Sequence, residues 1–193
     1  MGLWLMIGKC VLAAKVVSVE YNPLWYYIAC STCNKVVQPY EEDPENGDLD
    51  DESPPLFHCS ACDEVFFRVE AKYILVLRVT NESDEELRFL LFDHVARPFL
   101  RRSADALAEE VTLKPASEVP STLSNLVGKL MLLKILTSND NLKTRRVTYK
   151  VEIVVDDEKF VDKFVRNDSS KADNNQVSNH SSLDIWMPQN HQL

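Results

Sequence analysis

The sequence predicts an all-β protein with a few short helices, in which five strands form a barrel that is interrupted by a cysteine-rich insertion. Three observations favour this fold. Five segments have the alternating or nearly continuous apolar pattern of β-strands. Helix-forming sequences are confined to a few places between and after these segments. Two Cys-x-x-Cys pairs lie between the first strand and the second.

The predicted strands form one long first strand followed by two hairpins. They cover residues 9–20, 73–80, 87–92, 129–137 and 145–155. A polar turn joins the strands of each hairpin, as is typical of antiparallel pairs. Hydrophobic residues make up 45% of the chain, which is sufficient for a packed core in a single domain of this length.

Two helices are expected between the hairpins. Residues 103–110 begin with a serine suited to capping and continue with good helix formers, and residues 121–127 give a second short helix. A helix between the third and fourth strands of a five-stranded set is the order of an OB-fold. We therefore predict a five-stranded OB-fold barrel over residues 1–156, with an insertion at residues 26–70 between the first and second strands.

The insertion carries four cysteines in two closely spaced pairs, Cys30, Cys33, Cys59 and Cys62. Tetrahedral zinc takes four thiolates at about 2.3 Å, and two intervening residues let one tight turn present both sulfurs to the same ion. The pattern therefore predicts a zinc ribbon with one structural ion. Four sulfur ligands leave no position for water or substrate, so the ion would hold the backbone in place and would not be catalytic.

Disulfides and unliganded thiols are the alternatives to zinc, and paired short spacings without a secretory signal favour the metal. The apolar run at residues 3–7 is too short to span a membrane and no basic residue precedes it. We therefore expect a reducing intracellular compartment and no membrane partner. Cys10 stands apart and is expected to be a buried strand residue. His58 is a minor alternative ligand, because adjacent residues of an extended segment point to opposite faces.

The net charge of −9 is concentrated in one part of the chain. Residues 38–56 hold eight acidic residues, several prolines and no basic residue, whereas residues 72–156 hold thirteen Lys or Arg against twelve Asp or Glu. The acidic stretch is predicted to be a solvated loop that does not pair as a regular strand. It is either a tolerated insertion or a regulatory or partner-binding segment.

A series of motifs in a particular order indicates a family. Residues 25–37 read WYYIACSTCNKVV, a second Cys-x-x-Cys follows, and a strand begins at Tyr73. Residues 90–93 (LLFD) then precede a helix of the form Ser-Ala-Asp-x-Leu. In this order, residues 9–156 resemble the C-terminal DNA-binding domain of the large subunit of replication protein A. The chain is expected to be a single-domain relative or a fragment of such a subunit.

The resemblance implies an OB-fold with a zinc ribbon that binds single-stranded DNA, a nuclear location and assembly with two smaller subunits. It also implies roles in DNA replication, repair or recombination. Phe92 matches the family position at which an aromatic ring can stack on a base, although a place in the core is an equal alternative. Lys134, Arg145 and Arg146 lie on the last hairpin, where they face phosphates or simply solvent.

The chain departs from the family in two respects. Its ribbon loop is longer and far more acidic than usual. Residues 137–140 (TSND), at the end of the fourth strand, provide no second aromatic ring. One stacking platform is therefore expected to be missing, and the predicted affinity for DNA is modest.

A short amphipathic helix is predicted at residues 157–166, after the last strand. Its apolar residues Phe160, Val161, Phe164 and Val165 have helical spacing. In the family such a helix binds the two smaller subunits, and the alternative is that it packs on its own barrel. Residues 167–193 are rich in Asn, Ser, Asp, Gln and His and are predicted to be a disordered tail.

Single-stranded DNA binding with a structural zinc is the leading functional hypothesis. The alternative is a protein-interaction scaffold for smaller OB-fold subunits that binds DNA weakly or not at all. The sequence contains no recognisable nucleophile turn and no phosphate-cradling glycine loop. We therefore predict neither an enzyme nor a small-molecule substrate, and Asp93 and His94 are interpreted as the polar end of a strand.

Overall fold

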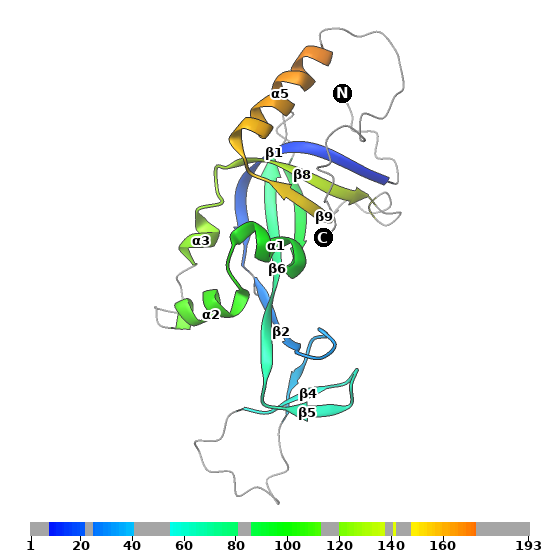
Figure 1. Cartoon of the computed structure of the whole chain (residues 1–193), viewed down its shortest axis with the longest axis vertical. Helices are drawn as coiled ribbons and strands as arrows, with labels where there is room; N and C mark the ends of the chain where they lie inside the picture. The colour runs from blue at the N-terminus through cyan, green and yellow to red at the C-terminus, as the bar shows by residue number, and fades with distance from the viewer. Residues whose placement is uncertain are drawn as a thin grey trace, which may run out of the picture.

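In the described part of the chain, five strands close into a barrel (Figure 1). They are β1 (Gly8–Glu20), β6 (Val69–Thr80), β7 (Glu86–Phe92), β8 (Leu130–Thr137) and β9 (Thr148–Val155). The computed structural model describes residues 8–21, 25–40, 55–80, 86–112, 120–137, 141 and 148–172. Around the barrel the order is β1-β8-β9-β7-β6, and β6 pairs again with β1. Only β7 and β9 are parallel to each other. This arrangement confirms the predicted five-stranded OB-fold.

β1 is long enough to pair along both of its edges. Residues 8–15 pair with β8, and residues 15–20 pair with β6 across a register shift between Val16 and Ser18. A shift of this kind bends the strand and increases its twist. The bend lets one strand close the barrel between two neighbours.

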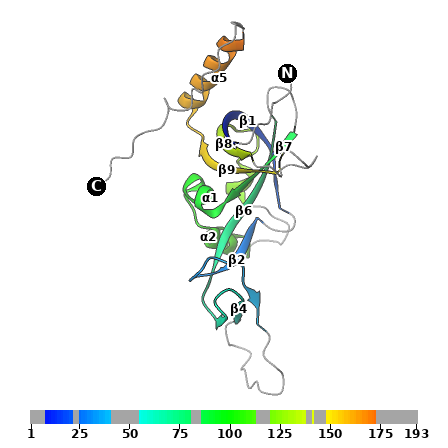
Figure 2. The ribbon, with the colours of Figure 1, turned by 90° about the vertical axis from the view of Figure 1, so that its right-hand side faces the viewer.

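The insertion forms a small ribbon below the barrel, and β6 runs continuously from one to the other (Figures 1 and 2). The first half of β6 pairs with β2 (Tyr26–Cys30), in a register that joins Tyr73 to Tyr26 and Val69 to Cys30. The rest of the ribbon is a three-stranded sheet of β3 (Gln38–Pro39), β4 (Phe57–Cys59) and β5 (Glu64–Phe66).

Two of the boundaries predicted at the ribbon differ from the structure. The strand predicted to begin at Tyr73 begins at Val69, because its first residues pair with β2 in the ribbon. Gln38 and Pro39 were assigned to an unpaired acidic loop, yet they pair with β4. Proline has no backbone N–H, but it is tolerated in β3 because β3 is an edge strand. The missing donor there does not interrupt the hydrogen bonds between central strands. Residues 41–54 of the acidic stretch lie outside the described residues.

The barrel core follows from the two-residue period of its strands. On β6 the buried positions alternate as Ala71, Tyr73, Leu75, Leu77 and Val79. Where the ribbon meets the barrel, the ring of Trp25 lies 4.6 Å from that of Tyr26 and 5.7 Å from that of Tyr73. These separations are in the range of interacting aromatic pairs.

Among the described residues, three helices lie between β7 and β8 and complete the core. They are α1 (Asp93–Leu100), α2 (Ala104–Thr112) and α3 (Ser121–Ser124). Leu107 of α2 and Leu123 of α3 are fully buried with the barrel residues. The predicted helix at residues 103–110 corresponds to α2, which ends two residues later, and that at residues 121–127 contains α3, but α1 was missed. Asp93 and His94 open this helix and do not end a strand, so that interpretation was wrong.

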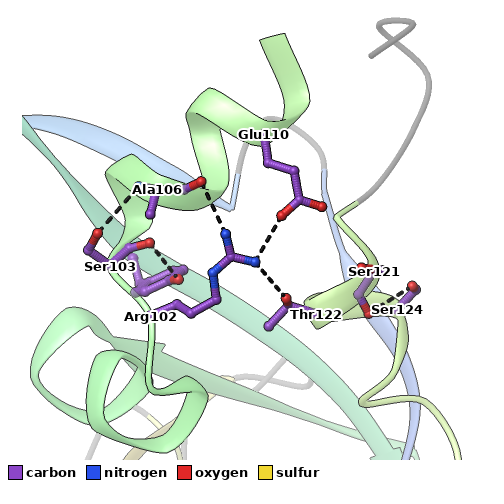
Figure 3. A network of polar contacts seen from close by, with 8 residues as sticks. Arg102, Ser103, Ala106, Glu110, Ser121, Thr122 and Ser124 are labelled. Atoms are coloured by element: carbon purple, nitrogen blue, oxygen red, sulfur yellow. Dashed lines mark hydrogen bonds and ion pairs between the residues drawn. The ribbon is translucent and has the colours of Figure 1, made fainter. Parts of the chain in front are cut away.

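Arg102 joins α2 to α3 (Figure 3). Its Nη1 donates to Glu110 Oε2 at 2.8 Å and to Thr122 Oγ1 at 3.4 Å, and its Nη2 donates to the carbonyl oxygen of Ala106. Ser103 Oγ accepts the backbone N–H of Ala106 and caps the start of α2, as predicted for a serine at this position. The network holds the two helices against each other.

Helix α5 (Glu158–Ala172) follows β9 and lies at the end of the molecule opposite the ribbon (Figures 1 and 2). Asp157 Oδ1 accepts the backbone N–H groups of Lys159 and Phe160 and caps the helix. The helix is longer than the predicted range 157–166 and includes the first residues assigned to the tail. Residues 173–193 lie outside the described residues. None of the described helices is long and apolar enough to span a bilayer.

Leu107→Ala should lower the free energy of unfolding by about 2–5 kcal/mol, because it leaves a cavity under α2 at the closed end of the core. Leu130→Ala is the matched control, since Leu130 is 44% exposed at the start of β8, and it should cost about 0.5 kcal/mol or less. Urea unfolding of both variants measures the difference. Equal losses of unfolding free energy in the two variants would show that α2 does not complete the barrel core.

Candidate functional site

The four paired cysteines converge in the ribbon. Their sulfur atoms all lie within 4.8 Å of one another. The Sγ atoms of Cys30 and Cys62 are 3.9 Å apart, and those of Cys33 and Cys59 are 3.5 Å apart. All four are free thiols, so the predicted alternative of disulfides is not what the structure contains. The cluster has the size and composition of a site for one metal ion.

Two turns of similar geometry present the sulfurs. In the first, the backbone N–H of Asn34 donates to the carbonyl oxygen of Cys30, and in the second, that of Asp63 donates to Cys59. Asn34 and Asp63 have φ of 59° and 56°. This left-handed conformation costs Asn and Asp less than most other residues. The residue after each Cys-x-x-Cys pair therefore closes its turn.

A small core surrounds the cluster. Cys30, Cys59 and Val37 are buried, and Phe57 and Phe66 pack against them. His58 lies on the opposite face of β4, where its Nε2 is 3.5 Å from Asp63 Oδ1. Within the described part of the chain, the group of possible ligands consists of the four cysteines and does not include His58.

The thiols in the cluster differ in acidity. The backbone N–H of Cys33 lowers the pKa of Cys30 to about 7, whereas the Cys33 sulfur, followed by burial, raises the pKa of Cys62 to about 12. Four adjacent thiolates repel one another, and a divalent cation between them removes that repulsion. The donor set therefore fits a metal ion that is held by sulfur alone.

A second candidate site is the outer face of β6, β7 and β9. In an antiparallel pair, directly opposite residues lie on the same face. Ile74 of β6 is opposite Phe92 of β7, and Val76 is opposite Leu90. Lys150 of β9 lies beside Leu90 in the parallel pair. Of the strand faces of an OB-fold, that of its second and third strands, here β6 and β7, is the one that binds oligonucleotides.

Phe92 has its ring at one end of this face. Its side chain is half-buried, and Lys150 Nζ lies 5.4 Å from the centre of the ring. A cation at this distance is attracted to the face of the ring. The neighbouring residues Phe89 and Leu91 point into the core and are fully buried. Phe92 is therefore on the outer face, and the alternative of a core position does not hold.

Most other cations near this face are already paired. Lys72 Nζ lies 2.5 Å from Glu70 Oε2, and this contact lowers the pKa of Glu70. Arg78 pairs with Glu86. Arg88 makes a two-pronged contact with Glu20 at the end of β1, with 2.9 Å between Arg88 Nε and Glu20 Oε1. Such bidentate pairs hold both side chains in a fixed geometry.

The structure separates Lys134, another predicted DNA-contacting residue, from Phe92. Lys134 is on the outer side of β8 and is half-buried, opposite Val11 of β1 and Ile153 of β9. β9 lies between β8 and β7 in the sheet. Arg145 and Arg146 lie outside the described residues. Of the described predicted residues, Phe92 alone is on the face of β6, β7 and β9.

Sequence analysis missed two residues of this face, Lys72 and Lys150, and also Tyr27, which lies beside it on β2. Tyr27 is opposite Lys72 in the pair of β2 and β6, which puts both on the outer side. Lys150 stands between the buried residues Tyr149 and Val151. That alternation is visible in the sequence and would have put Lys150 on the outside. Its position near Phe92 depends on the parallel pairing of β7 and β9, which the sequence does not reveal.

The predicted partner-binding residues of α5 divide between two environments. Val161 is 3% exposed and packs towards its own barrel, whereas Phe160 is 52% exposed. Phe164 and Val165 are half-buried. Val165, Asp162 and Arg166 border a shallow pocket together with Leu130 of β8. The helix is thus fixed to the barrel through one side and leaves Phe160 exposed on another.

Comparisons with known proteins agree with this geometry. The family described as "Replication factor-A C terminal domain" matches residues 10–162. One similar solved structure is a chain of a replication protein A heterotrimer bound to ssDNA, with a TM-score of 0.61 and 22% identity. The match covers 86% of this chain and 36% of that one, so this chain spans about a third of that relative.

A second similar structure is yeast RPA bound to ssDNA, with a TM-score of 0.58 and 21% identity over 89% of this chain and 90% of that one. At these identities the two likenesses concern the fold. A search of curated proteins gave no match. The family match spans residues 10–162 of the 193, and the chain therefore belongs to the replication factor-A C-terminal domain family.

Proposed function

We propose that this domain binds single-stranded DNA across the outer face of β6, β7 and β9, and that it is not an enzyme. The observation that carries the proposal is the pairing of Phe92 with Lys150 on that face. Binding to single strands requires aromatic rings on which bases stack and cations that meet the phosphates. Membership in the family supports the same function, and both similar structures are of replication protein A bound to ssDNA.

The four-cysteine cluster is proposed to hold one structural zinc ion. Cys30, Cys33, Cys59 and Cys62 would supply four thiolates, and zinc commonly takes this donor set with closed tetrahedral coordination. When bound, the ion would cross-link the two turns of the ribbon. A nuclear location and roles in DNA replication, repair or recombination follow from the family and are part of this proposal.

Zinc analysis of the purified protein tests the ribbon. We expect about one zinc per chain, and Cys59→Ser should remove most of it because Cys59 is a buried member of the cluster. Cys10→Ser is the matched control, since Cys10 is a half-buried residue of β1 outside the cluster. Inductively coupled plasma mass spectrometry measures the content. Wild-type zinc content in Cys59→Ser would contradict the assignment.

Titration of a fluorescent single-stranded oligonucleotide with the protein tests DNA binding. A length of about 30 nucleotides is sufficient, because one OB-fold covers about 4–16 nucleotides. We expect binding that weakens as the salt concentration rises, and we expect duplex DNA to be a poor competitor for it. Phe92→Ala should raise Kd about 5- to 150-fold, the equivalent of one stacked base. Phe160→Ala on α5 is the control and should leave Kd unchanged. Equal competition by duplex, or a wild-type Kd for Phe92→Ala, would contradict the proposed site.

A second function, binding of smaller replication protein A-like subunits, is favoured by the exposed ring of Phe160 on α5. Phe160→Ser should abolish co-purification with such subunits and leave the melting temperature unchanged, because the side chain is outside the core. Val36→Ser on the ribbon, where Val36 is 54% exposed, is the matched control. Retained co-purification of Phe160→Ser would exclude α5 as the contact.

A further inference from the structure

His94 provides a second aromatic ring beside Phe92. Its ring is 6.5 Å from that of Phe92, centre to centre, and the two planes differ by 14°. His94 is exposed, and Phe92 is half-buried. Rings in direct face-to-face contact would have centres about 3.5–4 Å apart, the contact distance of carbon atoms. At 6.5 Å the rings are close to parallel but are not in direct face-to-face contact, so aromatic surface is left for a third ring.

The start of α1 holds the two rings in this arrangement. Phe92 is extended, with φ of −82° and ψ of 167°, and the helix begins at the next residue. Asp93 Oδ1 accepts the backbone N–H of Tyr73 on β6 at 3.1 Å. Val95 and Ala96, directly after His94, are buried in the core. His94 is therefore fixed by an anchored residue on each side, and Asp93 is a positioning residue for both rings.

Lys150 completes the arrangement with a positive charge. Its Nζ is 5.4 Å from the centre of the Phe92 ring. Unlike Lys72, Arg78 and Arg88, it has no carboxylate at ion-pair distance among the residues that the structure describes. A ligand that combines a flat aromatic group with an anion matches two parallel rings and an unpaired cation. A nucleotide of a single strand has both parts.

We propose that Phe92 and His94 form a two-ring platform on which a base of single-stranded DNA stacks, with Lys150 facing the adjoining phosphate. The inference rests on the proposed function and adds His94, which comes from α1 and not from a barrel strand. Residues 137–140 provide no second aromatic ring, as noted from the sequence, and His94 supplies a ring from another element. Stacking is tolerant of sequence because every base has a π-face.

The test is oligonucleotide affinity for three substitutions of His94 in the full chain. His94→Ala should raise Kd about 5- to 150-fold, the effect of losing one stacked base. His94→Gln keeps polar atoms but has no ring, so it should bind as weakly as the alanine variant. His94→Phe keeps a ring and should restore binding. His58→Gln, in the ribbon, is the matched control and should bind as wild type.

Two further readouts separate stacking from charge and from folding. The dependence of log Kd on log salt should be the same for His94→Ala and wild type, because loss of stacking releases no counterions. The melting temperature should also be unchanged, since the side chain is exposed. A smaller salt dependence in His94→Ala would mean that His94 acts as a charge, and would overturn the platform.

The remaining outcomes are equally decisive. If His94→Ala binds the oligonucleotide with wild-type affinity while Phe92→Ala binds more weakly, this inference would be overturned and the proposed function would stand. If His94→Gln binds as wild type but His94→Phe does not, His94 would act by hydrogen bonding to the DNA, and the inference would also be overturned. If the wild-type protein itself does not bind single-stranded DNA at low salt, both the proposed function and the platform fail.

Discussion

The structure depends on one strand that belongs to two cores. β6 contributes Leu75, Leu77 and Val79 to the barrel, and its first half pairs with β2 beside the cysteine cluster. Ile28 of β2 packs against both cores. Because backbone hydrogen bonds fix the register of β2 and β6 residue by residue, the position of the ribbon follows from that of the barrel. A metal that closes the ribbon thus acts on a strand that also carries the proposed DNA-binding face.

The same strand explains why the site is at the start of α1. β7 pairs with one edge of β6 and ends opposite Ile74. Residues 69–73 of β6 therefore have no strand partner along that edge. Two carboxylates take the place of that partner, since Asp93 accepts the N–H of Tyr73 and Asp105 accepts that of Ala71 at 2.6 Å. Buried backbone donors must be satisfied. The need to satisfy these two donors brings α1 and α2 onto β6 and places His94 beside Phe92.

The barrel and the metal cluster were predictable from local patterns. Strand alternation and two Cys-x-x-Cys spacings are repeated signals, and both are set by near neighbours in sequence. Helix α1 was missed because it is short, follows a strand without a break and contains Pro98, which lacks a helical donor. The positions of Lys150 and His94 near Phe92 depend on pairing between distant segments. Such contacts have no signature in a single sequence.

Hydrogen exchange along β6, measured with and without a chelator, tests the shared strand most directly. Metal ligation in such a site contributes to folding free energy, and the barrel has a separate core. We expect chelation to remove protection from the amides of β2 and of residues 70 and 72, which face β2. Residues 71, 73 and 75–80 should stay protected, because Ala71 and Tyr73 belong to the barrel core and donate to Asp105 and Asp93. Loss of protection along the whole of β6, or no loss at residues 70 and 72, would contradict the account of one strand that serves two separable cores.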